Sequence, residues 1–278
     1  MLIANDMALL TFLPLGYFVL STTGKKKYLA FTFIMQNIAA NLGGMLTPFG
    51  NPQNLYLYTK FTIPTDEFMG IMLVPFLIAV TLITVCCFLF VKKEDMTIDE
   101  EKITLPLWRT VVYGVLFALS IVIVFRLIPF WIGLLVIPVA LLFLDRKALA
   151  KVDYGLLFTF MAFFVFSGNM ARIPTIERAL GSLMQKNALL VSTLSCQVIS
   201  NVPSAILLSQ FTGNYKALLL GVNIGGCGTL ISSLASLITF REYTAHKPDA
   251  AKKYILLFSA FNFAFLGILL GACALLVR

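Results

Sequence analysis

The sequence predicts an all-α integral membrane protein built from two inverted repeats, each with a re-entrant hairpin and an unwound transmembrane helix. Composition predicts the membrane: 59% of the 278 residues are hydrophobic and 12% are charged, against about 25% charged residues in soluble domains. Two Gly-rich interruptions of long apolar stretches, at residues 41–55 and 223–237, predict the repeats. Such breaks at matching places in two halves of a membrane protein point to a transport site.

The two interrupted segments share residues in register. At a constant offset of 182 positions, the identical pairs are Asn41 and Asn223, Gly43 and Gly225, Gly44 and Gly226, Thr47 and Thr229, and Leu55 and Leu237. A break leaves backbone groups without helical partners, which lipid cannot satisfy but a bound ion or substrate can. Small residues also allow close helix packing, but two aligned copies, one with Pro48 and Pro52, favour a site.

The remaining elements follow from length and hydropathy. A bilayer needs about 20 apolar residues per helix, which predicts spans at roughly 28–58, 66–91, 109–125, 127–144, 152–170, 217–240 and 254–277. Two further apolar stretches, about 1–21 and 187–213, are interrupted by polar residues. Pro203 cannot continue a helix, so 187–213 is expected to form two short helices that meet at a polar tip. The stretch 1–21 is expected to carry the equivalent tip at Asn5.

Basic residues predict the orientation. With the 187–213 hairpin open to the outside, 14 of the 21 Lys and Arg residues lie in inside connections and 7 lie outside, as the positive-inside bias requires. The protein is then a multi-pass protein of the cytoplasmic membrane with its C-terminus outside. We expect a first, incomplete repeat over 1–91, a cytoplasmic linker over 92–108 and a second repeat over 109–278.

The two predicted repeats differ in length before their polar tips. Only four residues precede Asn5, whereas 92 positions separate Arg109 from Asn201. We therefore expect the chain to be a truncated form of a larger transporter, or to be completed by a partner subunit.

Amides, hydroxyls and one carboxylate supply the candidate site. Substrate contacts are expected from Asn5, Thr47, Asn51, Asn54, Ser200, Asn201, Thr229, Ser232 and Ser233. Ion coupling is expected at Asp6, Asn5, Gly44, Asn201, Gly226 and Ser236, because carboxylate, hydroxyl and freed carbonyl oxygens suit a hard cation such as Na+. Asp6 stands well inside an apolar stretch, where a carboxylate is costly. Helix capping by Asp6 and turn stabilisation by the asparagines are the alternatives.

Several classes of function are disfavoured. The net charge of +8 fits the positive-inside bias better than nucleic-acid binding. The five cysteines have no metal-type spacing, and the single histidine, His246, lies in a predicted charged loop. No set of nucleophile and base can be assembled, so we expect no enzyme and no cofactor other than Na+ or H+ as coupling ion.

Four motifs carry a family resemblance: Asn-Asp-Met-Ala-Leu-Leu-Thr (5–11), Thr-Pro-Phe-Gly-Asn-Pro-Gln-Asn-Leu (47–55), Ser-Asn-Val-Pro-Ser-Ala (200–205) and Gly-Thr-Leu-Ile-Ser-Ser-Leu-Ala-Ser-Leu (228–237). The chain resembles the citrate-transporter-like division of the ion-transporter superfamily, which includes divalent-anion/sodium symporters, arsenite-efflux permeases and Na+/H+ antiporters. The resemblance implies inverted repeats, substrate and Na+ at the hairpin tips and an elevator-like motion. The expected partners are a small anionic substrate, the lipid bilayer and, in the full-length form, a second copy in a homodimer.

The expected function is ion-coupled transport of a small anion, either a carboxylate or an oxyanion. Dicarboxylate members of the resembled group show Ser-Asn-Thr at both tips, whereas this chain has Ala-Asn-Asp and Ser-Asn-Val. That departure favours the arsenite-permease side of the group. The same features are compatible with a Na+/H+ antiporter and, with less support, with an ion channel or a structural membrane subunit.

Overall fold

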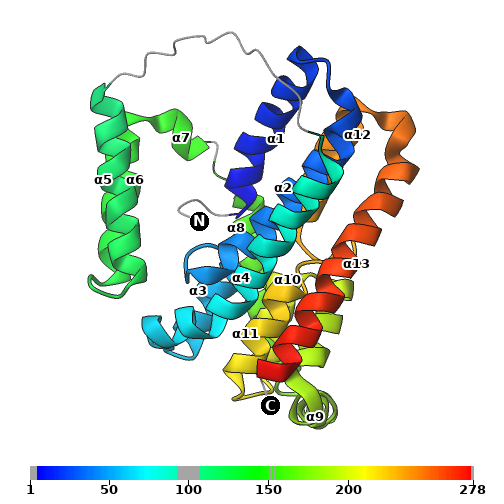
Figure 1. The fold of residues 1–278 in the computed structure, drawn as a ribbon. Helices are drawn as coiled ribbons and strands as arrows, with labels where there is room; N and C mark the ends of the chain where they lie inside the picture. The colour runs from blue at the N-terminus through cyan, green and yellow to red at the C-terminus, as the bar shows by residue number, and fades with distance from the viewer. Residues whose placement is uncertain (1–4, 93–106, 151, 153, 277–278) are drawn as a thin grey trace. The chain divides into compact units, whose positions relative to one another are not determined.

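The computed structural model describes residues 5–92, 107–150, 152 and 154–276, which contain helices and no strands. The chain divides into two compact units, a larger one of residues 1–98 with 163–278 and a smaller one of residues 99–162 (Figure 1). This division by packing differs from the predicted division into repeats, which stays a prediction.

The larger unit holds most of the helices. They are α1 (Asn5–Thr22), α2 (Leu29–Gly43), α3 (Pro52–Lys60), α4 (Thr65–Phe90), α9 (Pro174–Ile199), α10 (Asn201–Leu208), α11 (Tyr215–Ile224), α12 (Leu234–His246) and α13 (Ala251–Leu276), with 3-10 turns at Lys26–Tyr28, Gly44–Leu46 and Pro248–Ala250. Helix α2 packs against α1, α4, α12 and α13, and α11 packs against α9, α10 and α3. Residues 217–224 of α11 are all buried. The two helices that lead into the Gly-rich breaks are therefore central elements of this unit.

Both predicted interruptions are confirmed as breaks in helices. Helix α2 continues through the 3-10 turn, and the chain becomes extended at Thr47 (φ −114°, ψ 148°) before α3 begins at Pro52. Proline is favoured in a first helical turn because its missing N–H is not needed there. The second break lies between α11 and α12, where the Ser233 side chain caps α12 by accepting from the Ser236 N–H at 3.2 Å.

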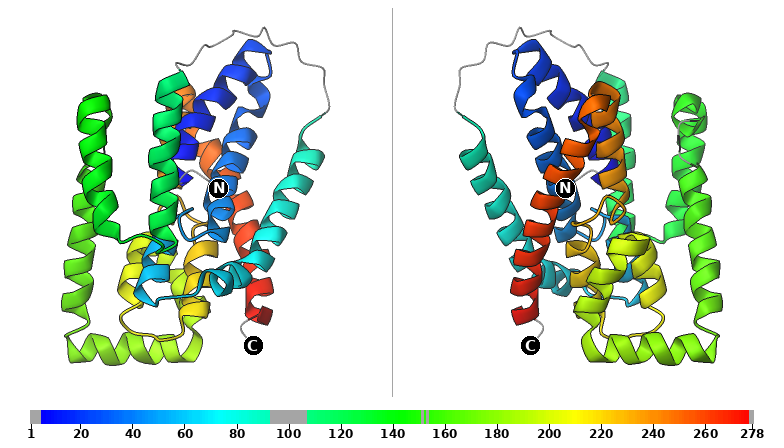
Figure 2. Two further views of the ribbon diagram at one scale, coloured as in Figure 1. Left: turned by 90° about the vertical axis from the view of Figure 1, so that its left-hand side faces the viewer. Right: turned by 90° about the vertical axis from the view of Figure 1, so that its right-hand side faces the viewer.

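The stretch 187–213 forms two helices that meet near its middle, as expected. Helix α9 ends at Ile199 and α10 begins at Asn201, with Ser200 between them at a φ of 73°. The chain turns at Ser200, and Pro203 lies in the first turn of α10, where a proline fits. Helix α9 is itself kinked at Asn187 (φ −159°), and its first part lies crosswise to α13 (Figure 2).

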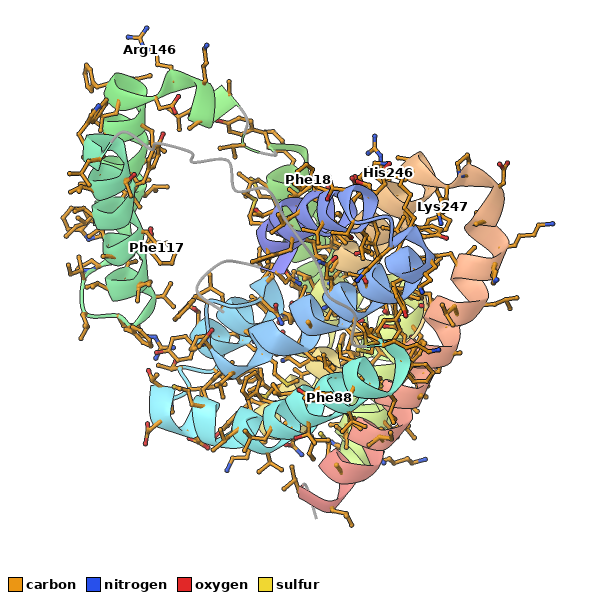
Figure 3. All side chains as sticks on the ribbon, turned by 45° about the horizontal axis from the view of Figure 1, so that its top comes forward. Phe18, Phe88, Phe117, Arg146, His246 and Lys247 are labelled. Carbon is orange, nitrogen blue, oxygen red and sulfur yellow. The ribbon has the colours of Figure 1, made fainter. Side chains whose placement is uncertain are left out.

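Several long apolar helices can cross a bilayer by length and composition. In the described residues they are Lys26–Leu46, Thr65–Phe90 and Pro248–Leu276, with a bent pair, Leu157–Met170 and Pro174–Ile199, at 99°. Large apolar side chains such as Phe88, Leu256 and Val198 are more than 70% exposed, and Figure 3 labels Phe88 on α4. An outward-facing apolar surface of this kind is expected for a protein in contact with lipid.

Two details differ from the sequence-based expectation. Helix α12 runs six residues past the predicted end at 240, so His246 lies at a helix end and not in a loop. Its ring stacks on Tyr17 of α1 with centroids 3.6 Å apart, and its Nε2 lies 3.3 Å from the Glu242 carboxylate. These two contacts extend the helix beyond the apolar stretch. The predicted linker 92–108 falls almost wholly on residues outside the described part, and α5 already begins at Leu107.

The smaller unit contains α5 (Leu107–Val124), α6 (Phe130–Leu144) and α7 (Arg146–Ala150), and α8 (Tyr154–Met170) begins in it and ends in the larger unit. The Tyr113 hydroxyl donates to the Asp145 carboxylate at 2.6 Å. Asp145 also accepts from the Ala148 N–H at 3.2 Å, which caps α7. One carboxylate therefore joins α5 to the turn between α6 and α7.

Candidate substrate and ion site

A group of polar side chains is buried where the breaks of the larger unit meet. Each exposes 5% of its surface or less: Asn5, Asn37, Asn41, Asn51, Gln53, Asn54, Asn201, Asn223, Ser232, Ser233 and Ser236. They come from α1, α2, α3, α10, α11, α12 and the two breaks. Because a buried polar group is destabilising unless it finds a partner, their hydrogen bonds define what this cluster can do.

The side chain of Asn54 forms hydrogen bonds that hold the first break in shape. Its Nδ2 group donates to three carbonyls that the end of α2 leaves without helical partners, those of Gly44 (3.3 Å), Met45 (3.2 Å) and Thr47 (3.3 Å). Its Oδ1 accepts from Asn223 at 2.6 Å. The sequence predicts that Asn54 contacts substrate, but its polar atoms here are all engaged in holding the shape of the break.

At the second break, the side chain of Gln197 of α9 likewise forms hydrogen bonds with backbone groups of the break. Its Nε2 donates to the carbonyls of Gly225 (2.9 Å) and Cys227 (3.0 Å), and its Oε1 accepts from the Thr229 N–H at 2.9 Å. The Thr229 hydroxyl donates back to the Gln197 carbonyl at 3.0 Å. The break is thus anchored to the helix that leads into the Ser200 turn.

The two breaks exchange side-chain hydrogen bonds. Asn41 of α2 donates to Ser233 Oγ at 3.0 Å, and Asn51 donates to Asn223 Oδ1 at 3.4 Å. At the offset of 182, Asn41 corresponds to Asn223 (41 + 182 = 223) and Asn51 corresponds to Ser233 (51 + 182 = 233). Each break is therefore bonded to the helix that leads into the other break, through equivalent positions.

The starts of α1 and α10 show a second matched pair of contacts. The backbone N–H of Asn5 donates to the Gly50 carbonyl at 3.3 Å, and that of Asn201 donates to the Ser232 carbonyl at 2.9 Å. Gly50 and Ser232 are also related by 182 positions (50 + 182 = 232). The start of α1 thus contacts the first break, and the start of α10 contacts the second break, at equivalent positions.

Some buried oxygens in this cluster have no donor. They are the side-chain oxygens Asn41 Oδ1, Asn51 Oδ1, Gln53 Oε1 and Thr47 Oγ1. These four oxygens belong to amide and hydroxyl groups and are therefore neutral. The described residues contain no group of three His, Cys, Asp or Glu side chains that could hold a metal ion. Asp6 lies in the first turn of α1, and its side chain is outside the described part of the structure.

A cavity of about 270 Å³ adjoins the first break. Its lining combines Asn5 and Leu9 of α1 with Gln36 of α2 and the glycines Gly43 and Gly44. The cavity is therefore continuous with the start of α1 and with the end of α2, where the freed carbonyls lie.

The structure brings most of the predicted site residues together. Asn5, Gly44, Asn51, Asn54, Asn201, Gly226, Ser232, Ser233 and Ser236 are buried around the breaks, and Thr47, Ser200 and Thr229 are partly buried there. Sequence reasoning omits Asn37, Asn41, Gln53, Gln197 and Asn223 from the site. For Asn41 and Asn223 a signal exists, since they are identical in the two aligned segments. Gln53 and Gln197 have no counterpart in the opposite repeat that would draw attention to them.

Residues 1–215 match the protein family described as citrate transporter. The chain belongs to the citrate transporter family. It is 37% identical over 243 residues to an uncharacterized transporter of Methanocaldococcus jannaschii, which covers 86% of this chain and 66% of that protein. It is 31% identical over 217 residues to the inner membrane protein YbiR of Escherichia coli, covering 75% of this chain and 57% of the relative. The chain thus spans less than two thirds of the length of each of these relatives. Family membership and the apolar helices together indicate a multi-pass membrane protein.

Proposed function

We propose that this protein is an ion-coupled secondary transporter of a small anion, with its cargo held where the two breaks meet the starts of α1 and α10. The observation that carries the proposal is the matched set of contacts at an offset of 182. Across the breaks the paired positions are equivalent, with the donor on the leading helix in one pair and on the break in the other. At the helix starts the accepting carbonyls, those of Gly50 and Ser232, are 182 positions apart. A reciprocal pattern of this kind is expected where two copies of one motif face each other about a two-fold axis.

The same contacts support an inverted-repeat arrangement. In Figure 1, α1 and α12 extend from the breaks toward one end of the larger unit, whereas α10 and α11 lie toward the opposite end. A re-entrant hairpin at 187–213 and an equivalent one that includes α1 belong to this proposal. So do an elevator-like motion of the site-bearing helices and a homodimer of the full-length protein.

The chemistry of the site favours an anionic substrate with a cationic partner. Helices α1 and α10 begin in the cluster, and the N–H groups of a first helical turn, with the positive end of the helix dipole, attract anions. Carbonyl, amide and hydroxyl oxygens of the breaks attract a hard cation. When an anion and a cation bind side by side, each stabilises the other by opposite charge. The binding of the two ligands is therefore coupled.

Uptake into proteoliposomes tests the proposal. Citrate, succinate, sulfate and arsenite are offered separately, with an inward Na+ gradient, an inward proton gradient or no gradient. We expect accumulation of one anion class under one gradient only, and loss of that accumulation in Asn201→Ala. Gln185→Ala, an exposed position on α9, is the matched control and should transport normally. Currents far above transporter turnover, or no gradient-driven accumulation of any anion, would contradict the proposal.

A further inference from the structure

Two basic connections of the larger unit lie at the same end of that unit and are bonded to each other (Figure 1). The connection between α1 and α2 carries three consecutive lysines at residues 25–27. The end of α12 and the start of α13 carry Arg241, Lys247, Lys252 and Lys253. The Lys247 Nζ donates to the carbonyl of Lys26 at 3.2 Å. We call these seven cations the basic end.

Tyr17 of α1 lies between the two connections. The His246 ring stacks on it with centroids 3.6 Å apart, and the Lys26 Nζ lies 5.9 Å from its centroid. Figure 3 labels His246 and Lys247 at this end of the larger unit. The end of α1 and the end of α12 are therefore held together in the middle of a group of cations.

The basic end carries a large excess of positive charge. Residues 23–28 and 241–253 contain seven Lys and Arg against two acidic residues, Glu242 and Asp249, so their formal charge is +5 with His246 neutral (7 − 2 = 5). The Glu242 carboxylate lies 3.3 Å from His246. The positive-inside bias explains why such residues share one side of a membrane. It does not explain why two basic connections are bonded together, since like charges repel and destabilise a compact arrangement. A bound anion would offset that repulsion.

Exposed apolar side chains adjoin these cations. Leu256 of α13 is 73% exposed, and it follows the exposed residues Lys252 and Lys253 by four and three positions. Residues at these spacings are neighbours on a helix surface. On α1, Phe18 is 56% exposed and follows Tyr17 directly. Cations beside exposed apolar groups suit an amphiphile, because a soluble anion would leave the apolar groups uncovered.

We propose that the basic end is a docking site for the phosphate-bearing headgroups of anionic phospholipids. Clusters of about four to eight basic residues beside membrane-spanning helices attract such headgroups. The headgroup lies against the lysines of both connections, and its acyl chains run along Phe18 and Leu256. Because α1 and α12 belong to opposite predicted repeats, the lipid stabilises a contact between the two repeats. This inference goes beyond the proposed transport and does not depend on it.

Thermal unfolding of the purified full chain in neutral detergent tests the assignment. Dioleoylphosphatidylglycerol, which is anionic, or dioleoylphosphatidylcholine, which is zwitterionic, is titrated into the micelles. We expect only the anionic lipid to raise the unfolding temperature, and to do so saturably. Lys252→Gln with Lys253→Gln should raise its half-saturating concentration several-fold, and adding Lys26→Gln should raise it at least tenfold, since each change removes one cation. Lys252→Arg with Lys253→Arg keeps the charge and should behave as the unaltered protein does.

Two exposed cations on the first part of α9 provide the matched control. Arg178→Gln with Lys186→Gln removes the same amount of charge from exposed positions outside the basic end, and it should change the half-saturating concentration less than twofold. Equal shifts in the two double Gln variants, or equal stabilisation by the two lipids, would overturn the inference. Inorganic phosphate at constant ionic strength should not stabilise the protein saturably. If it does so through the same lysines, the ligand is a soluble anion and the lipid assignment is wrong.

This inference and the proposed function fail separately. Gradient-driven accumulation of an anion by a protein that does not respond to the anionic lipid would overturn the docking site and leave transport standing. Lysine-dependent binding of the anionic lipid without any gradient-driven uptake would overturn the transport proposal instead.

Discussion

Adjacent glycines at the end of α2 predict opposite responses to the same substitution. Gly43 (φ −66°, ψ −36°) and Gly44 (φ −70°, ψ −12°) both have backbone conformations open to any residue. Space distinguishes them. A methyl group on Gly44 would overlap the Asn51 side chain and come within 2.9 Å of the Gly50 carbonyl, whereas a methyl group on Gly43 meets no atom within 4 Å.

The expected loss of stability in Gly44→Ala follows from the hydrogen bonds that Asn51 would lose. In Gly44→Ala the displaced Asn51 amide loses its bonds to the Asn41 carbonyl at 3.0 Å and to Asn223 Oδ1 at 3.4 Å. At about 1 kcal/mol per hydrogen bond and about 1–3 kcal/mol for overpacking, the expected destabilisation is about 3–5 kcal/mol. Gly43→Ala should be neutral or stabilising by up to about 1 kcal/mol, because alanine favours helix over glycine.

Thermal unfolding of the two purified variants in the same detergent measures this difference. We expect Gly44→Ala to unfold at least about 5 °C below Gly43→Ala, and to lose uptake in proteoliposomes. Equal unfolding temperatures for the two variants would refute the reasoning, because the close approach of Gly44 to Asn51 would then not stabilise the break.

Three more predictions concern the second break and the start of α1. Gln197→Leu should destabilise the protein by about 2–4 kcal/mol, since it orphans buried carbonyls; Gln185→Leu, on the exposed side of α9, should change the unfolding temperature little. Ser200→Gly should keep or raise stability, by up to about 1 kcal/mol, because Ser200 has a positive φ of 73° that glycine adopts without strain; if its hydroxyl contacts cargo, uptake should fall while the unfolding temperature does not. Asp6→Asn should abolish the dependence of uptake on the driving cation; unchanged dependence would remove Asp6 from the coupling mechanism.

The sequence predicts helix breaks well here because their causes are local. Proline and glycine clusters interrupt helices wherever they lie, so the breaks near Thr47 and Gly226 can be located from residue types alone. The same reasoning predicts a polar tip that includes Ser200 and Asn201, and the turn is observed at Ser200, with Pro203 in the first turn of α10, where a proline fits.

The roles of individual side chains depend on long-range contacts, so they are harder to predict from the sequence. The sequence predicts a cargo contact for Asn54, yet its amide binds the carbonyls of its own break. Gln197 anchors a break that begins 28 residues later in the chain, and periodicity gives no sign of this. The charged residues around His246 end the apolar pattern and so predict a loop, whereas stacking on Tyr17 extends the helix.

The crossed bonds between the breaks have a consequence for biosynthesis. Asn41 and Ser233 are separated by 192 residues, and Asn54 and Asn223 by 169. At about 5–20 residues per second, a ribosome needs about ten to forty seconds to reach the later partners. During that interval the nascent first half holds several amides with no final acceptor, so insertion machinery or temporary water must shelter them until the second half emerges.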